Sequence, residues 1–212
     1  KREKGGSSSP VALLQLSTRE RVWVVDLQLL CRAFPGGSSD TDLTPEEHLV
    51  NEALKMVFVD HRVLKIGLGP QTDLKRLSWS YPHMQCFKSF NAVIDVSTLV
   101  KRANPEEVSA RSIEGLSKLC QHVLKYAIDK SMQCSDWSAR PLSQEQLNYA
   151  SLDAFVLTQL FDTIVATLRE NRARVSASGD DSDSHTEKGV PVTQKAEKKK
   201  TKRAPSAETV VR

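Results

Sequence analysis

The chain has 212 residues, of which 39% are hydrophobic and 26% are charged, which is typical of a globular protein in water. No apolar run approaches the roughly 18 residues of a bilayer span, and the four cysteines are too few and too widely spaced for a disulfide scaffold. These values count against membrane-spanning and disulfide-rich secreted proteins, and the length allows one domain with a tail.

Two short runs rich in Val and Leu open the predicted domain. Val11 to Leu16 and Val22 to Asp26 are separated by five polar or charged residues, which predicts two strands joined in a hairpin. Further on, Thr44-Pro45-Glu46-Glu47 offers an N-cap oxygen, a proline at the first helical position and a glutamate at the third. This capping box predicts a helix that ends at about Phe58.

The remaining predicted elements alternate before the chain becomes helical. They are a strand at 63–68, a helix from about 71 that ends before Pro82, a strand at 92–96, a helix at 112–124 and a long helix at 144–170. In the long helix Ser143 and Gln146 form a second capping box, and an apolar stripe recurs at steps of three and four. The stripe contains Leu147, Ala150, Ala154, Leu157, Phe161, Ile164 and Leu168. This order indicates a mixed α/β sheet covered by helices.

Charge separates a domain from a tail. Residues 171–212 contain ten Lys and Arg against six Asp and Glu and hold no Leu, Ile, Phe, Met, Trp or Tyr, so we predict a disordered basic tail. We therefore expect a flexible segment at 1–10, a domain at 11–170 and the tail at 171–212. The lysine-rich cluster Lys198 to Arg203 weakly favours a nuclear rather than a cytoplasmic location, although a solvated charge run explains it equally well.

Asp153 is the most unusual residue of the long predicted helix. It lies within Ala150 to Leu157, where nearly every other direction around the axis is apolar, so its carboxylate is expected to be partly desolvated. An unpaired buried charge costs about several kcal/mol, so we expect Asp153 to pair with a basic group or to bind a cation. Tyr149 precedes it by one turn, which puts the phenol and the carboxylate on the same helix face. Taken alone, this spacing occurs often by chance.

Asp73 is a second candidate, in the first turn of the helix that follows Gly67-Leu68-Gly69. An Asp in a first turn stabilises the helix dipole by roughly 0.3–1 kcal/mol, and on local grounds this role is favoured over catalysis. Its position favours a site, because a carboxylate at the carboxyl end of a strand and one on a later buried helix can meet at one edge of an α/β sheet.

Two groups of residues carry a resemblance to a known family. Asp129 to Leu142 (DKSMQCSDWSARPL), followed by Gln146-x-x-Tyr149-Ala150-x-x-Asp153-Ala154, resembles the C-terminal signature of exonucleases related to ribonuclease D and the Werner-syndrome exonuclease. Val11 to Leu16, Val24-Val25-Asp26 and Lys65 to Gly69 follow the family's order. The resemblance covers about Pro10 to Leu168 and is closest to the exonuclease 3′-5′ domain-containing proteins.

This resemblance implies a ribonuclease H-like fold, two divalent ions (Mg²⁺ or Mn²⁺) and hydrolysis of nucleotides from the 3′ end of DNA or RNA. Carboxylate oxygens suit such hard cations, which activate water and stabilise a pentavalent phosphate. Asp73 and Asp153 match the third and fourth acidic ligands of the family. Tyr149 matches the phenol that orients the attacking water, which is the mark of the DEDDy-type members.

One family motif is missing from its expected place. The family's Asp-x-Glu, on a central strand, normally lies shortly before the segment that matches Val11 to Leu16, and none stands there. Glu3 is no substitute, because it lies among Lys, Arg and Gly without strand character. We expect an N-terminally truncated domain that binds a metal pair poorly, turns over slowly if at all, and exposes unpaired strand edges.

Other interpretations remain open at this point. A non-catalytic nucleic-acid-binding module with the same fold is the main alternative, and sequence upstream of Lys1 decides between the two. A nucleotide-binding protein would depend on Gly67-Leu68-Gly69, which lacks a third glycine and a phosphate-binding lysine. Trp137 and Trp79 are expected to be packing anchors rather than base-stacking groups, and Cys120 and Cys134 to be small buried residues.

Overall fold

The computed structural model describes residues 9–39, 42–104, 115–178 and 207–209. The predicted hairpin is confirmed as β1 (Leu13–Ser17) and β2 (Val22–Asp26), which pair antiparallel. The Thr18 hydroxyl accepts hydrogen bonds from the backbone N–H groups of Glu20 and Arg21, which closes the turn. A short strand, β5 (Ala207–Thr209), pairs parallel with the other edge of β2.

The second pair of predicted strands forms a separate sheet. The strands β3 (Lys65–Gly67) and β4 (Val93–Asp95) pair parallel, with α3 (Pro70–Ser80) and the 3₁₀ helix η1 (Gln85–Phe87) in the connection. Within the described residues no ladder joins β1 to β3, so the mixed sheet is present in two pieces. One edge of β1 and one edge of β3 therefore lack a strand partner in this part of the chain.

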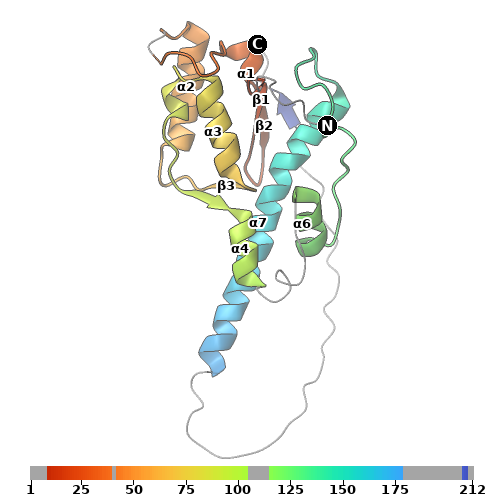
Figure 1. Cartoon of the computed structure of the whole chain (residues 1–212). Helices are drawn as coiled ribbons and strands as arrows, with labels where there is room; N and C mark the ends of the chain where they lie inside the picture. The colour runs from red at the N-terminus through yellow and green to blue at the C-terminus, as the bar shows by residue number, and fades with distance from the viewer. Residues whose placement is uncertain (1–8, 40–41, 105–114, 179–206, 210–212) are drawn as a thin grey trace, which may run out of the picture.

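The long helix α7 (Gln144–Ser178) holds the two pieces together (Figure 1). It packs against β1, β2 and β3, and against α4 (Val96–Ala103) and α6 (Leu116–Val123) further along its length. The Ser143–Gln146 capping box is confirmed by two reciprocal hydrogen bonds of 3.0 and 3.2 Å. Part of the predicted stripe is buried, at Ala150, Ala154 and Ile164, and the helix also buries Val156 and Leu160.

The predicted end of this helix was eight residues short. It continues from 171 to 178 in the segment assigned to the tail, and Asn171 donates a hydrogen bond to the Ala103 carbonyl. A helix continues without apolar burial when its residues have fair helix propensity, and no glycine occurs between Gln144 and Ser178. The lysine-rich cluster at 198–203 lies outside the described residues.

By length and composition, α7 is the one described helix that could cross a membrane. Several of its apolar side chains have partners inside the protein. Val156, Leu160 and Ile164 belong to the core with α4 and α6, and Ala150 packs against the hairpin. These contacts are those of a core helix, and they account for its apolar composition.

A buried polar network lies under α2 (Pro45–Phe58), whose predicted capping box between Thr44 and Glu47 is confirmed. The Glu47 carboxylate is fully buried and accepts hydrogen bonds from the Arg32 backbone and guanidinium, both at 2.7 Å, and lies 3.2 Å from His83 Nε2. Burial raises the pKa of Glu47, but the hydrogen bonds from Arg32, Thr44 and His83 outweigh it and lower the pKa to about 2. The network fixes the start of α2 against the loop that precedes it.

The segment before β1 is fixed on the end of α3. The Val11 N–H donates to the Ser80 hydroxyl at 3.0 Å, and the Val11 carbonyl accepts from the Tyr81 hydroxyl at 2.5 Å. Ser80 and Tyr81 are both fully buried. Because α3 follows β3, these bonds connect the hairpin to the second sheet although the strands themselves are not paired.

Candidate active site

Tyr149 and Asp153 lie together on α7, as their spacing predicts. The Tyr149 hydroxyl and the Asp153 carboxylate are close enough for each to shift the pKa of the other. Desolvation raises the pKa of Asp153, and the nearby Tyr149 hydroxyl only partly offsets it. Burial and the Asp153 charge raise the pKa of Tyr149 to about 12, so its phenol is protonated at neutral pH. The predicted partial desolvation of Asp153 is confirmed, and no ion pair to Asp153 is present among the described residues.

Apolar neighbours enclose this pair. The Cys120 thiol on α6 is fully buried near Asp153, and desolvation, followed by the Asp153 charge, raises its pKa to about 12. The Trp137 ring packs on the Tyr149 ring, with centroids 5.9 Å apart, and contacts the cluster around Leu13 and Ala150. The predicted packing role of Trp137 is therefore confirmed. Cys134 was predicted to be buried, which is wrong, because it lies exposed in the loop before α7.

Asp73 lies in the first turn of α3, as predicted, directly after the turn at Gly67 to Gly69. Gly69 has a φ of 61°, and a Cβ on Gly67 would lie 2.9 Å from Pro70 Cβ, so this turn requires glycines. The residue is exposed, yet partial desolvation of its carboxyl raises its pKa against the lowering effect of Arg76. No hydrogen bond or ion pair joins Asp73 to Asp153 among the described residues.

The carboxylates of the described residues make only part of a metal site. Asp153 offers desolvated hard oxygens, which suit Mg²⁺ or Mn²⁺, and Asp73 offers a second carboxylate. No group of three or more His, Cys, Asp or Glu capable of holding an ion occurs in the described part of the chain. Asp-x-Glu occurs nowhere in the 212 residues. The described residues therefore do not make a complete site for a metal ion.

An ion pair close to the site was missed from the sequence. Asp26 at the end of β2 and Arg140 in the loop before α7 form a bidentate pair, 114 positions apart in the chain. Both residues lie inside the stretches that carry the family resemblance. The sequence contained no sign that they meet, because pairing across that separation depends on the fold.

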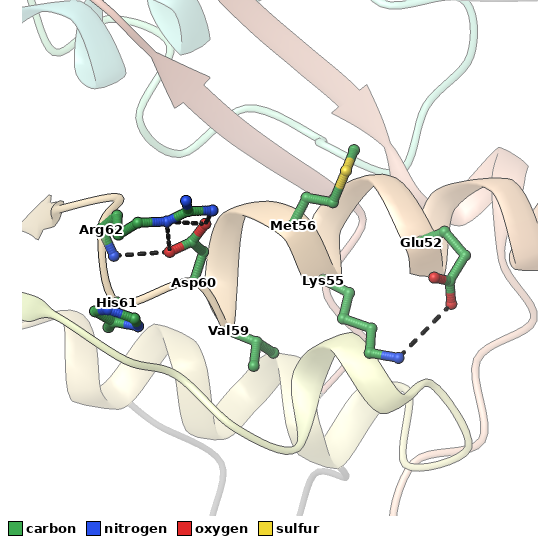
Figure 2. Close-up of a pocket in the computed structure, with 7 residues that line it drawn as sticks. All are labelled: Glu52, Lys55, Met56, Val59, Asp60, His61 and Arg62. Carbon is green, nitrogen blue, oxygen red and sulfur yellow. Dashed lines mark hydrogen bonds and ion pairs between the residues drawn. The ribbon is translucent and has the colours of Figure 1, made fainter.

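An open depression lies elsewhere, at the end of α2 (Figure 2). Its charged groups pair with one another, Lys55 with Glu52 at 4.0 Å and Arg62 with Asp60 at 2.7 Å. None of Asp73, Tyr149 and Asp153 lines it. The depression is therefore separate from the candidate site.

The fold defines the class of protein. The chain is similar to the exonuclease domain of Aedes aegypti Nibbler, with a TM-score of 0.61 and 26% identity over 82% of this chain and 80% of that one. It also shares the fold of Escherichia coli RNase D, with a TM-score of 0.51 and 20% identity over 78% of this chain and 40% of that one. The domain is thus an α/β, ribonuclease H-like nuclease fold.

The family follows from the sequence comparisons. A family model described as 3′-5′ exonuclease matches residues 4–169, and the chain belongs to this hydrolase family. The chain is 32% identical over 171 residues to an exonuclease mut-7 homolog of Aedes aegypti, which covers 75% of this chain and 22% of the relative. The chain therefore spans less than a quarter of that relative's length.

Proposed function

We propose that this domain is the catalytic part of a metal-dependent exonuclease that removes nucleotides one at a time from the 3′ end of a single strand. The observation that carries the proposal is the Tyr149–Asp153 pair, a partly desolvated carboxylate beside a protonated phenol, with no ion pair to Asp153 among the described residues. Such a carboxylate lacks a compensating positive charge, and a divalent cation supplies it.

Asp73 and Asp153 are the residues of this chain that hold divalent metal in the proposal. When bound, a Mg²⁺ or Mn²⁺ pair supplies Lewis acidity toward the phosphodiester and its attacking water. Tyr149 orients that water. A phenol with a pKa of about 12 keeps its proton at neutral pH, so it directs the water by hydrogen bonding and does not act as the base.

The remaining two ligands of the proposed site are an Asp-x-Glu, a motif that these 212 residues do not contain. Among the described residues one edge of β1 and one edge of β3 lack a strand partner, which supports a strand between the two sheets as its location. We expect the 212-residue chain alone to bind metal weakly and to turn over slowly. The nuclear location is a further proposal, and deleting residues 198–203 should move a nuclear fusion protein to the cytoplasm; an unchanged distribution would contradict it.

The alternative is a nucleic-acid-binding module without catalysis, which the incomplete carboxylate set favours. Two proteins separate these functions: the 212-residue chain, and a chain extended to include the residues that precede Lys1 in the parent. Shortening of DNA or RNA oligonucleotides from the 3′ end by the extended chain supports the exonuclease. Binding of oligonucleotide without shortening, in Mg²⁺ and in Mn²⁺, supports the alternative.

A further inference from the structure

The ion pair of Asp26 and Arg140 connects a strand of the hairpin to the loop before α7. Arg140 Nη2 donates to Asp26 Oδ1 at 2.7 Å and Nε donates to Oδ2 at 2.5 Å. The Asp26 side chain is 7% exposed and that of Arg140 is 25% exposed. A bidentate pair shielded from water in this way fixes the orientation of both groups.

Arg140 also organises its own loop. Its Nη1 donates to the Trp137 carbonyl at 3.0 Å and to the Ala139 carbonyl at 2.7 Å. The Gln28 side chain donates to the Ser138 carbonyl at 3.2 Å, which adds a second connection to the region after β2. On the other side of the loop, the Gln146 side chain of α7 donates to the Asp136 carbonyl at 2.9 Å.

These bonds surround Trp137, whose ring contacts the candidate site. Trp137 packs its ring on Tyr149, while its carbonyl is held by the guanidinium of Arg140. Asp26 holds that guanidinium from the end of β2. A continuous chain of contacts therefore runs from Asp26 through Arg140 and Trp137 to the phenol beside Asp153.

We propose that Asp26 and Arg140 are positioning residues: by holding Trp137 on the Tyr149 ring, they set the direction of the Tyr149 hydroxyl relative to Asp153. The ordinary alternative is that the pair only stabilises the loop. The proposal rests on the proposed role of Tyr149 as far as turnover is concerned, but the orientation of the phenol is testable in the 212-residue chain by itself.

The orientation is tested by ¹⁹F NMR of the chain labelled with 3-fluorotyrosine, which carries three tyrosines. Tyr149→Phe assigns the Tyr149 signal by its loss. Arg140→Lys keeps the charge but loses the planar fork that makes both bonds to Asp26. We expect it to shift or broaden the Tyr149 signal, as Trp137→Ala does, and to leave the Tyr126 signal in place.

A matched control exists on the same helix. Arg19 forms a bidentate pair with Asp162 of α7, at 2.6 and 2.9 Å, without contacting the loop. Arg19→Lys therefore removes the same kind of pair and should leave the Tyr149 signal unchanged. A Tyr149 signal that is unmoved by Arg140→Lys, or moved equally by Arg19→Lys, would overturn the inference.

Turnover gives a second test in the extended chain. Arg140→Lys should lower kcat roughly tenfold with little change in KM, because a misdirected phenol impairs the chemical step and leaves substrate binding intact. In a Tyr149→Phe background the same substitution should have no further effect on kcat. An equal additional loss in that background would show that Arg140 acts independently of Tyr149. Normal turnover by Tyr149→Phe alone would instead contradict the proposed function, whereas the NMR result still decides the orientation.

Discussion

Tyr149 lies one helical turn before Asp153 on α7, and the phenol and the carboxylate shift the pKa of one another. The phenol is protonated at neutral pH, burial partly removes water from the carboxylate, and no basic side chain forms an ion pair with Asp153 among the described residues. The pair accordingly has the chemistry of a site that is completed by a cation. Substitution of Asp153, Asp73 or Tyr149 should therefore have a different effect on stability, metal binding or turnover, and each effect is measurable by itself.

Asp153→Asn should leave the metal-free thermal midpoint at neutral pH equal or higher, because it removes a partly desolvated charge and keeps a side chain of nearly the same shape. Asp162→Asn, on the same helix, is the matched control and should not stabilise, because Asp162 is paired with Arg19. Thermal unfolding without metal measures both. A clear loss of stability in Asp153→Asn would show that its charge is already compensated inside the protein.

The effect of Asp153 on stability should depend on pH. Its folded pKa is raised above the unfolded value, so the folded state holds the proton more tightly, and its contribution to stability is lost as pH rises through the folded pKa. Asp153→Asn removes the titrating carboxyl group and with it this loss of stability. Wild type and variant should therefore converge at low pH, below the unfolded pKa of Asp, and diverge in favour of the variant toward neutral pH. Thermal midpoints of wild type and variant, measured at several pH values, show whether their difference grows as the pH rises.

Asp73→Asn should abolish exonuclease activity in the extended chain while changing the free energy of unfolding by less than about 1 kcal/mol, the upper range of a helix-dipole contribution at an exposed site. Glu145→Gln is a matched control, since Glu145 is the acidic residue in the first turn of α7. It should leave turnover unchanged. Reduced stability with intact turnover in Asp73→Asn would identify Asp73 as a helix-dipole residue only.

Tyr149→Phe keeps the ring against Trp137 but removes the hydroxyl, so both metal binding and substrate affinity should survive. Turnover should fall by about one to three orders of magnitude, as expected for a lost transition-state contact. Tyr126→Phe is the control, because the Tyr126 hydroxyl bonds Gln159 on the same helix away from the pair. Steady-state kinetics and a Mn²⁺ titration separate a role in orienting water from a role in binding metal. A collapse of metal binding in Tyr149→Phe would make Tyr149 part of the metal site.

Glu47→Gln should destabilise the domain by about 2–4 kcal/mol at neutral pH, because Arg32 loses its buried anionic partner. The folded pKa of Glu47 is about 2 against an ordinary value of 4.5, so its contribution, about 3 kcal/mol, is present above pH 4.5 and is lost as pH falls toward 2. Denaturant unfolding between these pH values should show wild type approaching the variant. Glu46→Gln, an exposed neighbour in the same turn, should change little.

Local chemistry made much of the fold predictable from the sequence. The capping boxes at Thr44 and Ser143 predicted two helix starts correctly, and the strand predicted at Val22 to Asp26 has the same bounds as β2. Helix α4 was missed, because its β-branched Val96, Thr98 and Val100 have modest helix propensity. Packing of α4 against α7 overrides that preference, and such packing is not visible in the local sequence.

The site was predictable only where its residues are near one another in the chain. Tyr149 and Asp153 are one helical turn apart, so periodicity alone placed them together. Asp26 with Arg140, and Glu47 with His83, meet through the tertiary fold, and local patterns contain no information about such pairs. The separation of the sheet into two pieces likewise depends on which strands pair with one another, and local sequence patterns do not show this pairing.

The most direct test of the account is exonuclease polarity in the extended chain. Single-stranded DNA and RNA oligonucleotides, each labelled at the 5′ end, are incubated with the wild type and with Asp153→Asn in Mg²⁺ or Mn²⁺. The proposed exonuclease should give a ladder of labelled products shortened from the 3′ end, which disappears on chelation of the metal and in the variant. Shortening by Asp153→Asn at the wild-type rate, or release of the label as a mononucleotide from intact strands, would contradict it.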